Sequence, residues 1–84
     1  MSERDLSLPE RILMVLHNLG VTYRDSAKNS TELAASLESS AEETDRILDK
    51  YESEGYAKSY VDGSGSRRYY LTGFGIIRTC SYFT

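Results

Sequence analysis

Two short helical patterns separated by two serines constrain this chain more than any other feature. Residues 30–55 read STELAASLESSAEETDRILDKYESEG. The spacing of the apolar residues predicts one helix over about residues 31–38 and a second over about 41–54. Gly55 is expected to end the second helix. A joint this short does not let the two helices lie antiparallel over their full length, so we expect them to cross steeply.

A helix is also expected before this pair, over about residues 8–19. Ser7-x-x-Glu10 is a capping-box pattern, and Pro9 suits a first turn because its missing N–H has no helical partner there. Gly20 is expected to end this helix. Its apolar residues at helical spacing are Leu8, Ile12, Val15, Leu16 and Leu19.

The sequence also predicts the caps and the buried sides of the two helices at about 31–38 and 41–54. Asn29 or Ser30 is expected to cap the first member, and Ser40-x-x-Glu43 is a second capping-box pattern that opens the other. Apolar residues at helical spacing predict the buried sides. They are Leu33, Ala34 and Leu37 in the first helix and Thr44, Ile47, Leu48 and Tyr51 in the second.

Strand-like segments surround the helices. Residues 21–23 are a short strand candidate, and residues 24–29 read as a polar loop. Two runs rich in Tyr and Val, about 57–61 and 67–71, flank the glycine-containing loop 62–66 and predict a β-hairpin. The final stretch, GFGIIRTCSYFT, has apolar residues near helical spacing and predicts a short C-terminal helix.

The length of 84 residues allows one domain, which we expect over residues 8–84 after a polar tail at residues 1–7. A chain of this size buries a thin core, and such chains often gain stability by association. The chain has more apolar surface than so small a core needs. We therefore predict a homodimer formed by the first helix and the C-terminal segment. The predicted interface residues are Leu13, Met14, Ile76, Ile77 and Phe83.

The order of these elements resembles the winged helix-turn-helix family, and most of all its small MarR, ArsR or PadR-type transcriptional regulators. The segment STELAASLESSAEETDRILDKYESEGY resembles the family's helix pair and turn, although Tyr51 stands where a leucine is common. RRYYLTGFG is similar to the segment that leaves the family's wing. The resemblance implies an α+β fold with a three-helix core, a β-hairpin wing and a short C-terminal helix.

The same resemblance implies that the helix at 41–54 enters the major groove of DNA as part of a transcriptional regulator. Residues carried over to base-edge positions are Ser40, Glu42, Glu43, Asp45 and Arg46. Residues expected at the phosphates are Lys28, Ser30, Thr31, Lys58, Arg67 and Arg68. Carboxylates can accept a hydrogen bond from cytosine N4, and acids in a first turn also interact favourably with the helix dipole.

The uneven charge leaves a second interpretation open. The net charge is −3, but residues 38–54 contain seven anions and two cations, whereas residues 55–84 contain one anion and four cations. An acidic helix disfavours general nucleic-acid binding. The alternative is a protein-interaction module whose acidic helix binds a basic partner without binding DNA.

Other functions find little support in the residues. His17 and Cys80 are the only histidine and cysteine, too few and too far apart in sequence for a metal site or a nucleophile–base set, so we expect no enzyme activity, metal or cofactor. A single cysteine fits a reducing compartment, and the first residues do not resemble a signal peptide. We therefore expect a cytoplasmic protein without membrane contact.

Overall fold

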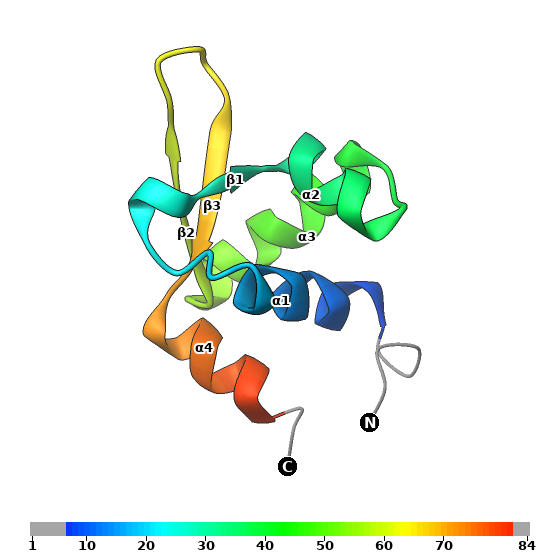
Figure 1. Ribbon diagram of the computed structural model, residues 1–84, viewed down its shortest axis with the longest axis vertical. Helices are drawn as coiled ribbons and strands as arrows, with labels where there is room; N and C mark the ends of the chain where they lie inside the picture. The colour runs from blue at the N-terminus through cyan, green and yellow to red at the C-terminus, as the bar shows by residue number, and fades with distance from the viewer. Residues whose placement is uncertain (1–6, 82–84) are drawn as a thin grey trace.

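The computed structural model describes residues 7–81, which form a helical body with a protruding β-hairpin (Figure 1). The three-helix core, the wing and the short C-terminal helix are present as expected. In chain order the elements are α1 (Leu8–Asn18), the 3₁₀ turn η2 (Arg24–Ser26), β1 (Lys28–Asn29), α2 (Ser30–Leu37), α3 (Ala41–Glu54), β2 (Ala57–Val61), β3 (Arg67–Leu71) and α4 (Gly73–Cys80).

Helix α1 begins as its sequence predicts and buries a wider surface than the predicted stripe, of which Ile12 and Leu16 are fully buried. The Ser7 hydroxyl accepts from the Glu10 N–H at 3.4 Å, and the Glu10 carboxylate accepts from the Ser7 N–H at 3.1 Å. Leu13 is fully buried within the single chain and Met14 nearly so, whereas Leu19 is 57% exposed. The prediction that Leu13 and Met14 face a second subunit is therefore wrong. Their surface is already covered because α1 packs against α2, β3 and α4 of its own chain.

Helices α2 and α3 lie within one residue of their expected bounds. Asn29 caps α2, with its side chain accepting from the Glu32 N–H at 2.8 Å. Glu38 ends α2 in the left-handed region at φ 54°. This single residue turns the chain sharply, and the Ser40 hydroxyl then caps α3 by accepting from the Glu43 N–H at 3.1 Å. The two helices pack against each other with Leu33, Leu37 and Leu48 in the core.

The sheet has the order β1-β3-β2, and both neighbours of β3 are antiparallel to it. The hairpin strands match their predicted bounds. The strand expected at residues 21–23 is not a strand, although the Val21 carbonyl accepts from the Leu71 N–H at 2.8 Å. The short edge strand forms instead at Lys28 and Asn29, opposite Tyr69 and Arg68. It places the start of α2 directly beside the wing.

Helix α4 closes the open end of the helical core beside α1 (Figure 1). Its cap is Thr72, which accepts from the Gly75 N–H at 3.1 Å and donates to the Gly55 carbonyl at 2.6 Å. Ile76 is partly buried against the core, whereas Phe74 and Ile77 are 72% and 69% exposed. Of the predicted interface residues, Ile77 thus remains accessible, and Phe83 lies outside the described residues. Within residues 7–81, no helix is long and apolar enough to cross a membrane.

Candidate nucleic-acid interface

Three carboxylates of α3 form one row that faces the wing. Asp45, Asp49 and Glu52 are spaced four and three residues apart, so they share one side of the helix. We call this row the wing-side flank. The Tyr69 hydroxyl on β3 donates to Asp49 Oδ1 at 2.5 Å and lies 3.3 Å from Asp45 Oδ1. Two of the acids that seemed to oppose DNA binding thus have a hydrogen-bonding partner inside the protein.

Tyr69 is fully buried, although its hydroxyl is directed at these acids. Burial disfavours the phenolate, and the hydrogen bond to Asp49 and the two nearby carboxylates disfavour it further. These causes raise the pKa of Tyr69 well above its usual range. The hydroxyl therefore remains a proton donor to the flank at all ordinary pH values.

The third carboxylate of the flank contacts the other strand of the wing. Glu52 Oε2 accepts from the Ser59 hydroxyl at 2.6 Å, and Ser59 Oγ accepts from Arg67 Nη1 at 2.9 Å. Arg67 also lies 3.8 Å from Glu52 Oε1, but its side chain is 50% exposed. The ion pair is loose enough for Arg67 to reach a second anion in solvent.

Arg68, the next residue, is held much more tightly. Its Nε donates to Asp62 Oδ2 at 2.6 Å, and its Nη1 donates to Glu32 Oε1 at 3.1 Å and to the Ala27 carbonyl at 3.2 Å. The other Asp62 oxygen accepts from Ser64 and from the Ser66 N–H. These hydrogen bonds, first to Ser64 and then to Arg68, hold the pKa of the Asp62 carboxyl well below its usual range.

The wing turn is thus connected to the start of α2 through one arginine. Glu32 Oε1 accepts both from Arg68 and from the Asn29 N–H at 3.2 Å. A carboxylate therefore already lies at the α2 N-terminus, the place where we expected a phosphate. The Glu32 N–H at the same helix start donates to the Asn29 side chain.

Arg67 and Arg68 project from opposite faces of the sheet, because successive strand residues alternate. Arg67 shares its face with Ser59, the face that contacts α3. Lys58 is paired with Tyr70 in the register and lies on the Arg68 face, where it is exposed. The phosphate residues predicted for the wing therefore do not form a single patch.

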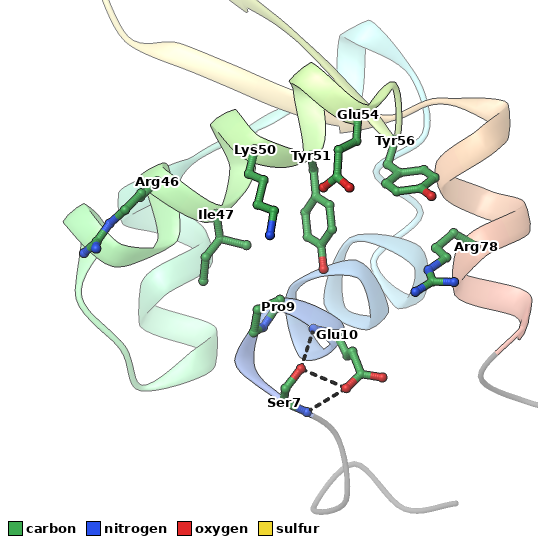
Figure 2. A pocket seen from close by; sticks show the side chains of 10 residues that line it. All are labelled: Ser7, Pro9, Glu10, Arg46, Ile47, Lys50, Tyr51, Glu54, Tyr56 and Arg78. Carbon is green, nitrogen blue, oxygen red and sulfur yellow. Dashed lines mark hydrogen bonds between the residues drawn. The ribbon is translucent and has the colours of Figure 1, made fainter.

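The cations of α3 lie on a different side of the helix from the wing-side flank. Arg46 and Lys50 are four residues apart and both line a cavity of about 490 Å³ between α1, α3 and α4. Figure 2 shows Lys50 and Arg78 pointing toward this cavity, while Arg46 points outward near the start of α3. Helix α3 is therefore acidic toward the wing, and its two cations lie on another side, where Glu54 lines the same cavity.

The remaining predicted site residues fall into two groups. Thr31, Ser40, Glu42, Glu43 and Arg46 are exposed at the helix starts, as base or phosphate contacts require. Ser30 and Asp45 are half-buried and bound to each other, with Ser30 Oγ donating to Asp45 Oδ1 at 2.7 Å. Lys28 is half-buried on β1. Ser30 and Asp45 thus connect α2 to α3.

Tyr69 and Asp62 both organise this site, and neither is among the site residues predicted from the sequence. The alternation of β3 could have revealed Tyr69, because it places that ring inward beside an acidic helix. Asp62 and Arg68 carry no comparable signal, since their contact spans the wing turn.

Comparison with solved structures places this architecture among known proteins. MepR of Staphylococcus aureus, a transcription regulator of the multidrug efflux pump MepA, matches with a TM-score of 0.74 at 17% identity, over 96% of this chain and 58% of MepR. TubR from Bacillus megaterium matches at 0.77 and 21%, over 95% of this chain and 89% of TubR. The fold is a winged helix-turn-helix.

A third match is a proposed DNA-binding protein from Ralstonia eutropha, with a TM-score of 0.75 and 20% identity over 90% of this chain and 94% of that one. No family model and no curated protein sequence matches the chain. At identities this low, the TM-scores establish the winged-helix fold alone. The function has to be argued from the residues of the site. This chain spans little more than half of the MepR chain.

Proposed function

We propose that this protein is a DNA-binding transcriptional regulator in which α3 approaches the major groove beside the wing. The observation that carries the proposal is the arrangement of charge on α3. Asp45, Asp49 and Glu52 have partners on α2 and the wing strands. Arg46 and Lys50 lie apart from them. Three of the six acids of α3 are thus engaged in contacts within the protein.

The fold supports the same proposal by analogy. MepR, one of the structural neighbours, has been solved in complex with DNA, and that structure matches with a TM-score of 0.70 at 17% identity over 94% of this chain and 63% of MepR. In winged helices of this kind the second helix of the pair reads bases and the wing contacts the backbone. The corresponding elements here are α3 and the β2–β3 hairpin.

The phosphate contacts we propose are fewer than the sequence suggested. Arg67 is the principal wing residue, because its guanidinium is half exposed and only loosely paired. Arg46, Lys28 and Lys58 supply further positive charge. Arg68 is assigned a structural role. Each phosphate that is neutralised should contribute about 0.9 to the log–log salt slope of binding.

Fluorescence anisotropy on mixed-sequence duplexes at low and moderate salt tests this proposal. The wild-type chain should bind at low salt and weaken as salt rises, and Arg46→Ala should reduce the affinity. Lys50→Ala controls for a general loss of positive charge on α3, because Lys50 points into the cavity (Figure 2). An equal loss of DNA affinity in both variants would indicate general electrostatic attraction to DNA and not docking of α3 in the groove. Absence of binding to every duplex at low salt would overturn the proposal.

A specific observation also favours a second candidate, a module that binds a basic protein. Glu42 and Glu43 are exposed at the start of α3. A basic partner could bind them without needing Arg67. Capture of such a partner that is lost in Glu42→Ala/Glu43→Ala, together with no duplex binding, would favour this function.

We also propose a homodimer, now placed on α4 alone. Phe74 and Ile77 are three residues apart and are both largely exposed, which makes them neighbours on one side of the helix. Helix α4 lies at the opposite end of the molecule from the wing tip (Figure 1). Pairing through α4 would therefore leave both wings accessible.

A further inference from the structure

Tyr69 combines complete burial with a polar end directed at two charges. Its ring is part of the hydrophobic core, and its residue surface is 0% exposed. Its hydroxyl lies 2.5 Å from Asp49 Oδ1 and 3.3 Å from Asp45 Oδ1. Donation to an ionised acceptor at the shorter distance is a charge-assisted hydrogen bond, stronger than one between neutral groups.

This contact joins the elements that the proposed DNA interface needs. Tyr69 belongs to β3, and its two acceptors belong to α3. Asp45 Oδ1 also accepts from Ser30 at the first turn of α2, 2.7 Å away. Tyr69 is further paired with Lys28 in the β1–β3 register. Wing, recognition helix and the start of α2 therefore meet at one hydroxyl and the carboxylate beside it.

The hydroxyl also resolves an electrostatic conflict within α3. Asp45 and Asp49 are like charges at i and i+4, an arrangement that disfavours the helix. A proton donor between them reduces the repulsion and holds both carboxylates on the wing-side flank. Without it, Asp49 would be free to turn toward the outer side of α3, where a duplex would lie, whereas Asp45 would keep the hydrogen bond from Ser30.

We propose that Tyr69 is a positioning residue for DNA recognition, whose hydroxyl fixes α3 against the wing and keeps Asp49 away from the duplex. This inference rests on the proposed function. Tyr69 touches no base or phosphate, since it is buried. It acts through the two aspartates and, by way of Asp45, through Ser30.

The test is Tyr69→Phe in the full chain, which keeps the ring and removes the hydroxyl. We expect DNA affinity to fall by about tenfold, the order of effect of one hydrogen bond to a charged group. Tyr70→Phe is the matched control, because Tyr70 is the next residue of β3 and lies on the opposite sheet face. It should bind DNA like the wild type. Affinities are compared only well below each variant's unfolding temperature, so that partial unfolding does not contribute.

A second variant separates positioning from simple stability. Asp49→Asn removes a charge but keeps an oxygen that can accept a hydrogen bond. Added to Tyr69→Phe, it should recover at least half of the lost affinity on a logarithmic scale, because the repelling pair no longer exists. If Tyr69→Phe binds as tightly as the wild type, or if Asp49→Asn recovers nothing, the inference is overturned.

Hydrogen exchange makes failure of this inference distinguishable from failure of the proposed function. Amide exchange in residues 41–49 should accelerate in Tyr69→Phe and stay unchanged in Tyr70→Phe, with residues 8–18 as the internal reference. If the wild type binds no duplex, the proposed function fails and the DNA role of Tyr69 fails with it. Even then, accelerated amide exchange in Tyr69→Phe would establish that the hydroxyl fixes α3. Unchanged exchange in Tyr69→Phe would overturn the structural role of the hydroxyl too.

Discussion

Arg68 Nε lies 2.6 Å from Asp62 Oδ2, and this pair joins the wing turn to the strand that leaves it. The same guanidinium reaches Glu32 at 3.1 Å, so the wing is also connected to α2. Arg67 donates to the Ser59 hydroxyl at 2.9 Å, lies 3.8 Å from its only acidic neighbour among the described residues, Glu52, and remains half exposed. Two adjacent arginines therefore have different roles, which follow from strand alternation and could not be read from the dipeptide.

Arg67→Ala and Arg68→Ala should consequently weaken DNA binding in different ways. Arg67→Ala should lower the log–log salt slope of binding by about 1, because one phosphate contact is lost. It should leave the unfolding midpoint almost unchanged, since exposed ion pairs contribute little. Arg68→Ala should make the wing turn sensitive to proteolysis and leave the salt slope intact. Salt-dependent anisotropy and limited proteolysis of each variant check the two outcomes, and an equal loss of slope in both would contradict the assignment.

The Asp62 carboxylate should make the stability of the wing depend on pH. Its pKa is lowered in the folded chain, so its contribution is complete above the unfolded value of about 3.9 and is lost as pH falls below that toward the folded pKa. Asp62→Asn should therefore destabilise the chain at neutral pH more than at about pH 2.5. Urea unfolding of both proteins at each pH measures the difference, and comparing the two chains cancels other titrating groups. A gap that is the same at both pH values would contradict this prediction.

Much of the fold followed from local patterns. Caps such as Ser7 and Ser40 and the end at Gly55 placed the helices, and the loop at 62–66 placed the hairpin, because these signals act within one or two turns of the chain. The strand at residues 28–29 was missed because it is defined by pairing with β3. Only two of its residues form ladder pairs, too few for an alternation to be visible in the sequence.

The site was harder to predict than the fold. The acids of α3 were visible, but whether a carboxylate meets solvent or a hydroxyl depends on contacts such as that between Asp49 and Tyr69, which are twenty residues apart. The apolar surface of α1 was misassigned for a related reason. Leu13 lies off the main stripe of the helix, yet it is buried because α1 is covered by several elements of its own chain.

Leu13→Ala and Ile77→Asp should therefore separate folding from association. Leu13→Ala should destabilise the monomer by about 2–5 kcal/mol, since it removes methyl groups from a filled core. It should not change the dimer directly. Ile77→Asp should leave the unfolding of the monomer nearly unchanged and abolish self-association through α4, because it places a charge in an apolar contact. Sedimentation at tens of micromolar with urea unfolding checks both, and a wild-type monomer at that concentration would remove the dimer proposal.

Gly75 should be the least replaceable glycine of α4, because the helix approaches the backbone of Tyr56 there. A Cβ added at Gly75 would lie 2.1 Å from the Tyr56 carbonyl oxygen and 2.9 Å from Leu71 Cδ2. The oxygen belongs to the main chain, and it accepts from the Thr72 N–H at 3.1 Å, so it cannot move aside alone. Gly75→Ala should thus push α4 away from the core and cost about 1–3 kcal/mol or more.

Gly73→Ala is the matched control for that substitution. A Cβ at Gly73 meets nothing within 4 Å, and the residue lies in the first turn of the same helix. The change should be neutral or stabilising, by up to about 1 kcal/mol, because alanine has the higher helix propensity. Urea unfolding measures both variants. If Gly75→Ala were as stable as Gly73→Ala, the close packing of α4 on the Tyr56 carbonyl would not exist, and the surface proposed for association on that helix would have to be reassigned.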